Sequence, residues 1–234
     1  MKQTAPLLSA FRAAFPVTLP VLTGFLVLGI AYGILMSTKG YGPLWSFAFS
    51  AIAFCGSMQF VAIPFLTSTF APLDVFFLSL MVNARHLFYG LSMLDKYNGT
   101  GRFKFPLIYY LCDENFAINS TAVVPQGIKA SHFYFAVTML DVFYWASASL
   151  LGGVIGKMLT INTKGLDFAL TALFIVLFLE QLKNTQSRIC GCIGVIASMI
   201  ALFSFGSNNM VIGAMLLILA ALLVGRKKIC HYLP

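Results

Sequence analysis

The sequence predicts an all-α polytopic membrane protein with seven or eight membrane segments, organised as two related halves with some discontinuous helices. Of its 234 residues, 59% are hydrophobic and 9% are charged, whereas a soluble domain carries about 25% charged residues. No hydrophilic stretch is long enough for a soluble domain, so residues 1–234 are expected to form a single integral membrane domain. The net charge is +8, but the basic residues separate the apolar segments. This pattern indicates control of membrane topology rather than binding to nucleic acid.

Hydropathy divides the chain into eight apolar segments, most of them long enough to cross a bilayer as a helix. Turn-forming residues separate several of them, at 37–43, 98–101, 125–127, 162–165 and 206–209. The expected segments are 14–36, 44–66, 72–93, 105–124, 132–156, 166–183, 189–205 and 208–225.

The first two segments are not expected to be plain helices. The first holds Pro16 and Pro20, and the second holds Gly56 and Pro64. Such residues free backbone groups that protein or trapped water must satisfy, and transporters use discontinuous helices of this kind to bind substrates and ions. Close packing of helices through small residues is an equally good explanation for any single glycine.

Three short matches predict an internal repeat with halves at about 14–125 and 132–225. They keep the same order along the chain, and many transporters consist of duplicated halves around a midplane site. The matches are FPVT at 15–18 with FAVT at 135–138, LGxxxG at 28–33 with 151–156, and TKG at 38–40 with 163–165.

The relative orientation of the halves depends on the fourth segment, 105–124. If it crosses the membrane, there are eight spans and the halves are parallel. If it enters and returns on the same side, there are seven crossings and the halves are inverted. The second arrangement places ten basic residues on one side against four on the other. The positive-inside rule favours it, with the N-terminus outside and the C-terminus cytoplasmic.

The third segment, 72–93, carries an arginine and a histidine near its middle. A charge at the bilayer centre costs roughly 3 kcal/mol or more, so such residues face a protein interior or a wet cavity. At about 100° per residue, Asn83, Arg85, His86 and Tyr89 fall on one arc of the helix. The opposite side suits lipid or packing contacts and holds Phe77, Leu80, Ala84, Leu87 and Leu91.

Two acids, Asp113 and Glu114, lie centrally in the fourth segment. Adjacent residues of a helix point about 100° apart, so these acids cannot both face one partner unless the helix is broken there. One of them is expected to pair with Arg85 or His86 while the other titrates. A purely structural ion pair between two helices is the alternative.

Asp141 is a secondary candidate for the same role. It lies inside the fifth segment, where an ionisable residue indicates function. Tyr144 and Trp145 follow it, and these residue types are typical of the membrane interface. A position near one membrane face is therefore the alternative for Asp141.

Four elements of the sequence together resemble a known family. They are the proline- and glycine-rich stretch 15–33, Gln59 in GSMQF, the pattern NxRHxxY at 83–89 and the pattern DExF at 113–116. In this order they resemble the AzlC family, the large subunits of bacterial branched-chain amino acid exporters. The resemblance implies an inner-membrane exporter that works with a small hydrophobic subunit of the AzlD type. It also implies export driven by an ion gradient, since the chain has no nucleotide-binding motif.

An aliphatic amino acid needs a cation or a helix N-terminus for its carboxylate, an acid or carbonyls for its ammonium group, and an apolar pocket for its side chain. The residues expected to bind substrate are Gln59, Asn83, Arg85 and Tyr89. The residues expected to couple protons or to form an ion pair are His86, Asp113 and Glu114.

A channel, a non-transporting sensor subunit and an intramembrane enzyme are the alternatives. Ser79 lies on the same helix face as His86, as a nucleophile and its base would, but GxSxG, HExxH and GxGD motifs are absent. Cys190 and Cys192 have neither CxxC spacing nor a histidine pair nearby for zinc. We therefore expect no catalytic activity, no cofactor and no metal.

Overall fold

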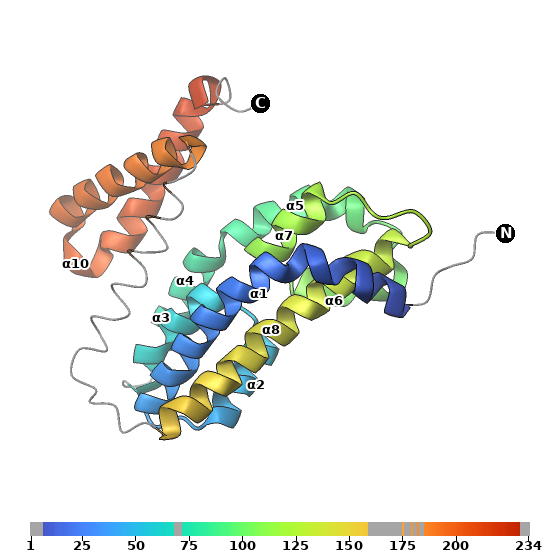
Figure 1. Cartoon of the computed structure of the whole chain (residues 1–234). Coiled ribbons are helices and arrows are strands. Elements are labelled where there is room, and N and C mark those ends of the chain that lie inside the picture. Colours follow the sequence, from blue (N-terminus) through green and yellow to red (C-terminus); the bar gives the residue numbers. More distant parts are fainter. Residues whose placement is uncertain are drawn as a thin grey trace. The chain divides into compact units, whose positions relative to one another are not determined.

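The computed structural model describes residues 7–67, 72–158, 175, 179, 182 and 185–229, and within them the chain forms helices and turns without a strand. It divides into two compact units, unit 1 (Met1–Thr163) and unit 2 (Lys164–Pro234) (Figure 1). The helical class predicted from the sequence is confirmed.

Two long helices, α1 (Leu7–Thr38) and α8 (Ala130–Met158), form the centre of unit 1 and lie side by side (Figure 1). Small residues permit this contact, because a Cβ atom at Gly33 would overlap the backbone of Ser149 and Gly153. Each helix is long and apolar enough to cross a membrane. Together they provide the scaffold on which the shorter helices of unit 1 pack.

The helices α1 and α8 run in the same direction. Phe11, near the start of α1, packs edge-on against Phe135, and Ser37, near its end, lies against Gly156. We call the end of unit 1 that holds the starts of both helices the first end, and the opposite end the second end. These two names locate the other helices.

Helix α2 (Pro43–Ala53) begins at the second end, where its first residue lies against Gly153. It then runs antiparallel to α8, and the Ser50 hydroxyl donates to Ser149 Oγ at 2.8 Å. Phe54 ends the helix with a left-handed backbone (φ 41°), a conformation that turns the chain sharply. Helix α2 therefore stops about midway between the two ends.

Helix α3 (Gly56–Thr67) returns to the second end. Near its start, Gln59 Nε2 donates to Ser50 Oγ at 2.9 Å. Near its other end, the Tyr41 hydroxyl donates to the carbonyl of Leu66 at 2.8 Å, and Tyr41 follows directly after α1. The helices α2 and α3 therefore form a hairpin whose tip points into the middle of unit 1.

Helices α4 (Pro72–Asn83) and α5 (Arg85–Tyr97) follow each other from the second end to the first end. The break between them is slight, because Ala84 keeps helical angles (φ −54°, ψ −31°). At the first end, the Tyr97 ring lies 5.9 Å from that of Tyr134 in α8. The apolar outer side is exposed as the sequence predicted, at Phe77, Leu80, Leu87 and Leu91.

The short helix η1 (Gly101–Phe103) and α6 (Lys104–Tyr109) enter unit 1 from the first end. The Phe103 ring lies 5.4 Å from the ring of His132 and 4.6 Å from that of Phe135, both in the first turns of α8. Helix α6 ends midway along the unit.

Helix α7 (Asp113–Thr121) then returns to the first end, so that α6 and α7 form a second hairpin. At its start, the Asn115 side chain accepts from the backbone N–H of Cys112 at 2.9 Å, as half of a capping box. Near its end, Asn119 Nδ2 donates to the Tyr97 hydroxyl at 3.0 Å. The two hairpins enter unit 1 from opposite ends.

Two expected membrane segments, 44–66 and 105–124, therefore fold back at their middles instead of running from end to end. From the sequence, a fourth segment that returns to its own side was expected to make the two halves inverted. This inference is wrong, because the second segment folds back as well. The matched stretches 28–33 and 151–156 lie on α1 and α8, which are parallel. Hydropathy could not separate one long helix from two half-helices of the same total length. The two internal prolines of α1 do not interrupt it.

Unit 2 is described chiefly by α10 (Thr185–Ile229). The predicted turn at 206–209 is present, because Gly206 leaves the helical conformation (φ 71°, ψ 174°) and divides α10 into two helices. The Phe205 ring fills the space beside Gly213. Most of the expected segment 166–183 lies outside the described residues.

Candidate functional site

The tips of the two hairpins meet in the middle of unit 1. The Tyr109 hydroxyl donates to the carbonyl of Ile52 at 2.8 Å, and the Tyr110 hydroxyl donates to the carbonyl of Ala51 at 3.1 Å. The last turn of α2 has carbonyls without helical N–H partners, and these two tyrosines supply donors there. The hairpin tips are thereby joined directly.

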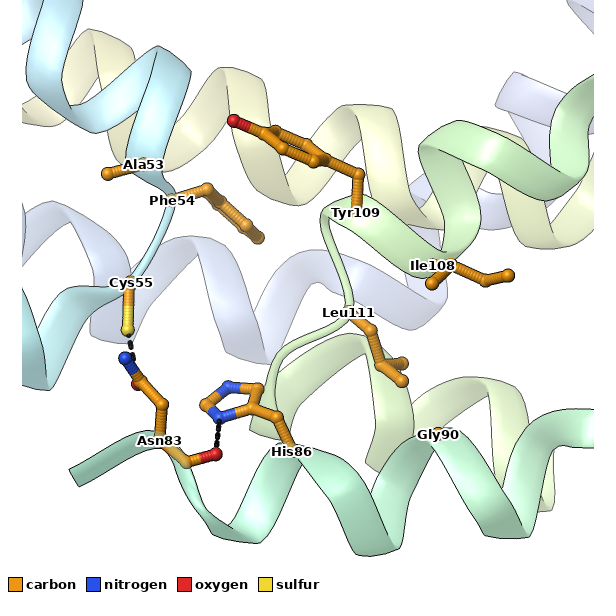
Figure 2. A pocket seen from close by; sticks show the side chains of 9 residues that line it. All are labelled: Ala53, Phe54, Cys55, Asn83, His86, Gly90, Ile108, Tyr109 and Leu111. Atoms are coloured by element: carbon orange, nitrogen blue, oxygen red, sulfur yellow. Dashed lines mark hydrogen bonds between the residues drawn. The ribbon is translucent and has the colours of Figure 1, made fainter. Parts of the chain in front are cut away.

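A cavity of about 240 Å³ lies beside this junction (Figure 2). This volume is below the range of about 300–1,000 Å³ typical of sites for drug-sized ligands, so it suits a small solute. The wall is part apolar and part polar, and it comes from both hairpin tips and from the α4–α5 region. It consists of Ala53, Phe54, Cys55, Asn83, His86, Gly90, Ile108, Tyr109 and Leu111.

Three polar side chains of the wall are held by one another (Figure 2). The Cys55 thiol donates to Asn83 Oδ1 at 2.8 Å, and His86 Nδ1 lies 3.1 Å from the carbonyl oxygen of Asn83. The Asn83 amide nitrogen donates weakly to Ser79 Oγ at 3.4 Å. These contacts fix the amide and the imidazole at one side of the cavity.

Arg85 forms an ion pair across the two helix breaks. Its Nη1 lies 2.8 Å from Asp113 Oδ2, which is one of the pairings anticipated from the sequence. Its Nη2 donates to Ser57 Oγ at 3.1 Å, in the first turn of α3. Arg85 Nε and Asp113 Oδ1 are inaccessible to water but have no hydrogen-bond partner in the described part of the chain. The Arg85 Nε–H can therefore donate one further hydrogen bond, and Asp113 Oδ1 can accept one.

Tyr89 stands beside this ion pair rather than in the cavity wall. Its ring stacks on Phe116 with centroids 4.5 Å apart and meets His86 edge-on at 5.6 Å. Its hydroxyl interacts with the carboxylate of Asp113. Tyr89 thus supports the position of Asp113 and of α7.

Glu114 differs from its neighbour Asp113 in its contacts, although Asp113 and Arg85 both act on it electrostatically. It interacts with the side chain of Cys112 and electrostatically with Asp141 of α8. Asp141 is fully buried (0% exposed). Asp141 is therefore surrounded by protein.

Gln59 belongs to a different set of buried contacts. Its Oε1 accepts from Trp145 Nε1 at 2.7 Å while its Nε2 donates to Ser50, and Ser50 in turn donates to Ser149. Gln59 is 1% exposed and does not line the cavity. Its amide joins the α2–α3 hairpin to α8.

The predicted site residues therefore divide into three groups. Asn83 and His86 line the cavity, and Arg85, Tyr89 and Asp113 lie next to it. Of the remaining three, Asp141 belongs to α8, Gln59 accepts a hydrogen bond from Trp145 of α8, and Glu114 interacts electrostatically with Asp141. The sequence did not single out Phe54, Cys55 and Ser57, which the structure places at the cavity or beside the ion pair. One sequence feature could have indicated them. Gly56 was predicted to break the second segment, and residues beside such a break are candidates for a binding site.

The arrangement places two helix N-termini, those of α3 and α7, in the middle of unit 1. The first N–H groups of a helix have no partner within it and carry partial positive charge. The N-terminus of α3 and Arg85 favour a small anionic group, whereas the first turn of α7 already carries Asp113, Glu114 and a capping box. Within the described residues, no cluster of three His, Cys, Asp or Glu side chains could hold a metal ion.

Comparisons with known proteins agree on one family. A family model described as "AzlC protein" matches residues 20–159. The chain is 48% identical to the "Branched-chain amino acid transport protein AzlC" of Bacillus subtilis, over 98% of this chain and 90% of that protein. No solved structure matches.

Other similar proteins carry membrane names. An "Uncharacterized membrane protein" of Helicobacter pylori is 35% identical over 95% of this chain and 97% of its own length. The "Inner membrane protein YgaZ" of Escherichia coli is 26% identical over 79% of this chain and 78% of its own length. Together with the composition and the apolar helices, these similarities mark the chain as a membrane protein.

Proposed function

The chain belongs to the AzlC family, and on that premise we propose that it is a multi-pass secondary exporter of branched-chain amino acids in a bacterial inner membrane. One observation carries the proposal in addition to the kinship with a branched-chain amino acid transport protein. It is the small cavity, with both apolar and polar lining, between two hairpins that enter from opposite ends and meet at two helix N-termini. Transporters commonly bind substrates near the bilayer midplane between discontinuous helices of this kind.

The chemistry of the cavity matches a zwitterion with a branched aliphatic side chain. The carboxylate is placed at the N-terminus of α3, within reach of Arg85, and the ammonium group at the amide oxygen of Asn83. The aliphatic side chain packs against Phe54, Ile108 and Leu111.

The basic residues of unit 1 support an orientation with the first end in the cytoplasm. Five of them, Arg12, Lys96, Arg102, Lys104 and Lys129, lie near the first end, whereas Lys39 and Lys157 lie near the second. The positive-inside rule then places the N-terminus inside. This orientation reverses the one favoured by the sequence alone, because that one assumed a single returning segment. The α6–α7 hairpin then enters from the cytoplasmic side.

Uphill export requires an energy source, and we assign it to the proton gradient. Moving one charge across 100 mV supplies about 2.3 kcal/mol. Asp113 forms an ion pair with Arg85, and His86 Nδ1 lies near the Asn83 carbonyl. Among the described residues Glu114 forms no ion pair, although Arg85 acts on it electrostatically, so Glu114 is the proposed proton carrier. The proton is therefore expected on the α8 side of α7.

A small hydrophobic AzlD-type subunit is the proposed partner. In the chain alone the side chains of Arg85 and Asp113 are 40% and 36% exposed. Ionised groups this deep between membrane helices have to be covered by protein or to face a wet cavity. A partner subunit is expected to supply part of that cover. Co-purification with a tagged small subunit in mild detergent tests the contact, and full transport by the chain alone would contradict an obligatory heteromer.

Counterflow in proteoliposomes tests the proposed activity. Vesicles loaded with unlabelled leucine are expected to accumulate labelled leucine or valine transiently, whereas a channel, a sensor or an enzyme gives no such overshoot. Asn83→Ala is expected to abolish counterflow because it removes the amide at the cavity wall. Asn98→Ala, which changes an exposed asparagine after α5, serves as the matched control and should behave as wild type. Equal loss in both variants, or no counterflow with any aliphatic amino acid, would refute the proposal.

A further inference from the structure

Asp141 is a buried acid without a counter-charge. It lies in the middle of α8, is 0% exposed, and neither carboxyl oxygen has a hydrogen-bond partner among the described residues. One turn earlier on the same face, the Thr138 hydroxyl is also fully buried and unpartnered. An isolated carboxylate in such surroundings is very costly, and the group neutralises instead.

The titratable groups that face Asp141 come from α7. Glu114 is its charged neighbour and would repel it if both were ionised, and the buried Cys112 thiol also lies within electrostatic range. The other helices that pack on α8 offer no compensating charge there. Their cations, Arg12, Arg102 and Lys104, are exposed.

We propose that Asp141 and Glu114 form a proton-binding carboxyl pair between α8 and the tip of the α6–α7 hairpin. Two carboxyl groups in one region of low dielectric cannot both ionise at low cost, so at least one of them holds a proton. When the pair is protonated, α7 rests against α8. When the proton leaves to water, the two carboxylates repel each other and favour separation of α7 from α8.

The pair is placed to couple this proton to the substrate cavity. Asp113 and Glu114 are neighbours at the start of α7, and Asp113 is paired with Arg85 beside the cavity while Glu114 interacts electrostatically with Asp141 of α8. A movement of the first turn of α7 would therefore alter the Arg85–Asp113 pair and the Glu114–Asp141 pair together. This step rests on the proposed transport function, whereas the presence of a protonated carboxyl does not.

Infrared spectroscopy of the purified protein tests the proton site without transport. The wild type is expected to show the C=O stretching band of a protonated carboxyl at neutral pH. Asp141→Asn should remove this band. Glu114→Gln should shift the band, because it replaces the neighbouring carboxyl with a glutamine amide that cannot ionise. Asp95→Asn changes an exposed acid of α5 and should leave the band in place. A wild-type spectrum without the band, or an Asp141→Asn spectrum that keeps it, overturns the pair.

Transport assays then test the coupling. Asp141→Asn should lose accumulation driven by a pH gradient and retain counterflow, since substrate binding survives. If the wild type shows the band but no counterflow, the transport proposal fails and the proton site stands. If Asp141→Asn keeps both pH-driven accumulation and counterflow, or if a sodium gradient drives the wild type instead, the coupling role is refuted. Should Asp141→Asn not fold, Glu114→Gln provides the same two measurements.

Discussion

The two hairpins of unit 1 have the same design but are held in place by different chemistry. The α2–α3 hairpin is joined to α8 by neutral buried hydrogen bonds through Gln59, Ser50 and Trp145. The α6–α7 hairpin also has neutral hydrogen bonds, through Tyr109, Tyr110 and Asn119, but in addition it carries charged or titratable contacts such as the Arg85–Asp113 pair. Neutral contacts do not respond to pH or membrane potential, whereas charged ones do. We therefore expect pH and membrane potential to affect the α6–α7 side of the cavity more than the α2–α3 side.

The largest expected effect comes from the scaffold that both hairpins share. Gly33→Val should prevent folding, because even a Cβ atom at Gly33 overlaps the backbone of α8. Gly24→Val is the matched control in the same helix, since a Cβ atom at Gly24 meets nothing within 4 Å. Membrane expression and size-exclusion profiles of the two variants measure this. A folded Gly33→Val protein with both hairpins intact would show that they do not depend on the α1–α8 contact.

The next largest effect concerns the charged hairpin. Arg85→Ala strands the carboxylate of Asp113, and breaking a buried pair costs about 3–5 kcal/mol, with the partial exposure of this pair favouring the lower end. The double change Arg85→Ala with Asp113→Ala should be less damaging to stability, because no charge is left alone. Thermal unfolding in detergent compares the two variants. A double mutant less stable than Arg85→Ala would contradict the role of the Arg85–Asp113 ion pair in holding α7 in place.

A moderate effect is expected in the neutral hairpin. Gln59→Leu leaves Trp145 Nε1 and Ser50 Oγ short of a partner, at a cost of about 1–3 kcal/mol. The loss should be the same throughout the neutral pH range, since no group of this set titrates there. Gln126→Leu, at an exposed position, is the control. A loss of stability that depends on pH in Gln59→Leu would contradict the distinction between the neutral contacts of α2–α3 and the charged contacts of α6–α7.

The smallest effect is expected at the end of α7. Lys96 Nζ donates to the carbonyl oxygens of Asn119 at 3.1 Å and of Ser120. A cation at a helix C-terminus contributes about 0.3–1 kcal/mol, screened by salt. Lys96→Gln should therefore lower the unfolding temperature slightly, and less at high salt, while Lys104→Gln should not. An effect independent of salt would mean that Lys96 acts through packing instead.

The sequence by itself determined the membrane setting, the helical class, several of the turns between segments and the polar cluster at 83–89. These follow from composition and from the periodicity of a single segment, which are local properties. The apolar outer side of α4 and α5 was predicted for the same reason. Pairing of Arg85 with an acid was also predictable, because an unpaired charge between membrane helices is costly.

Only the tertiary structure decided which segments fold back and what each polar residue faces. Hydropathy is the same for one helix that crosses and for two half-helices that meet at Phe54 and return, since both bury their apolar side chains equally. The separation of Asp113 from Glu114, and of Asn83 from Gln59, depends on which helices pack on either side of each residue. Those contacts join segments up to about a hundred residues apart, such as Ser50 and Ser149, and no local pattern of the sequence records them.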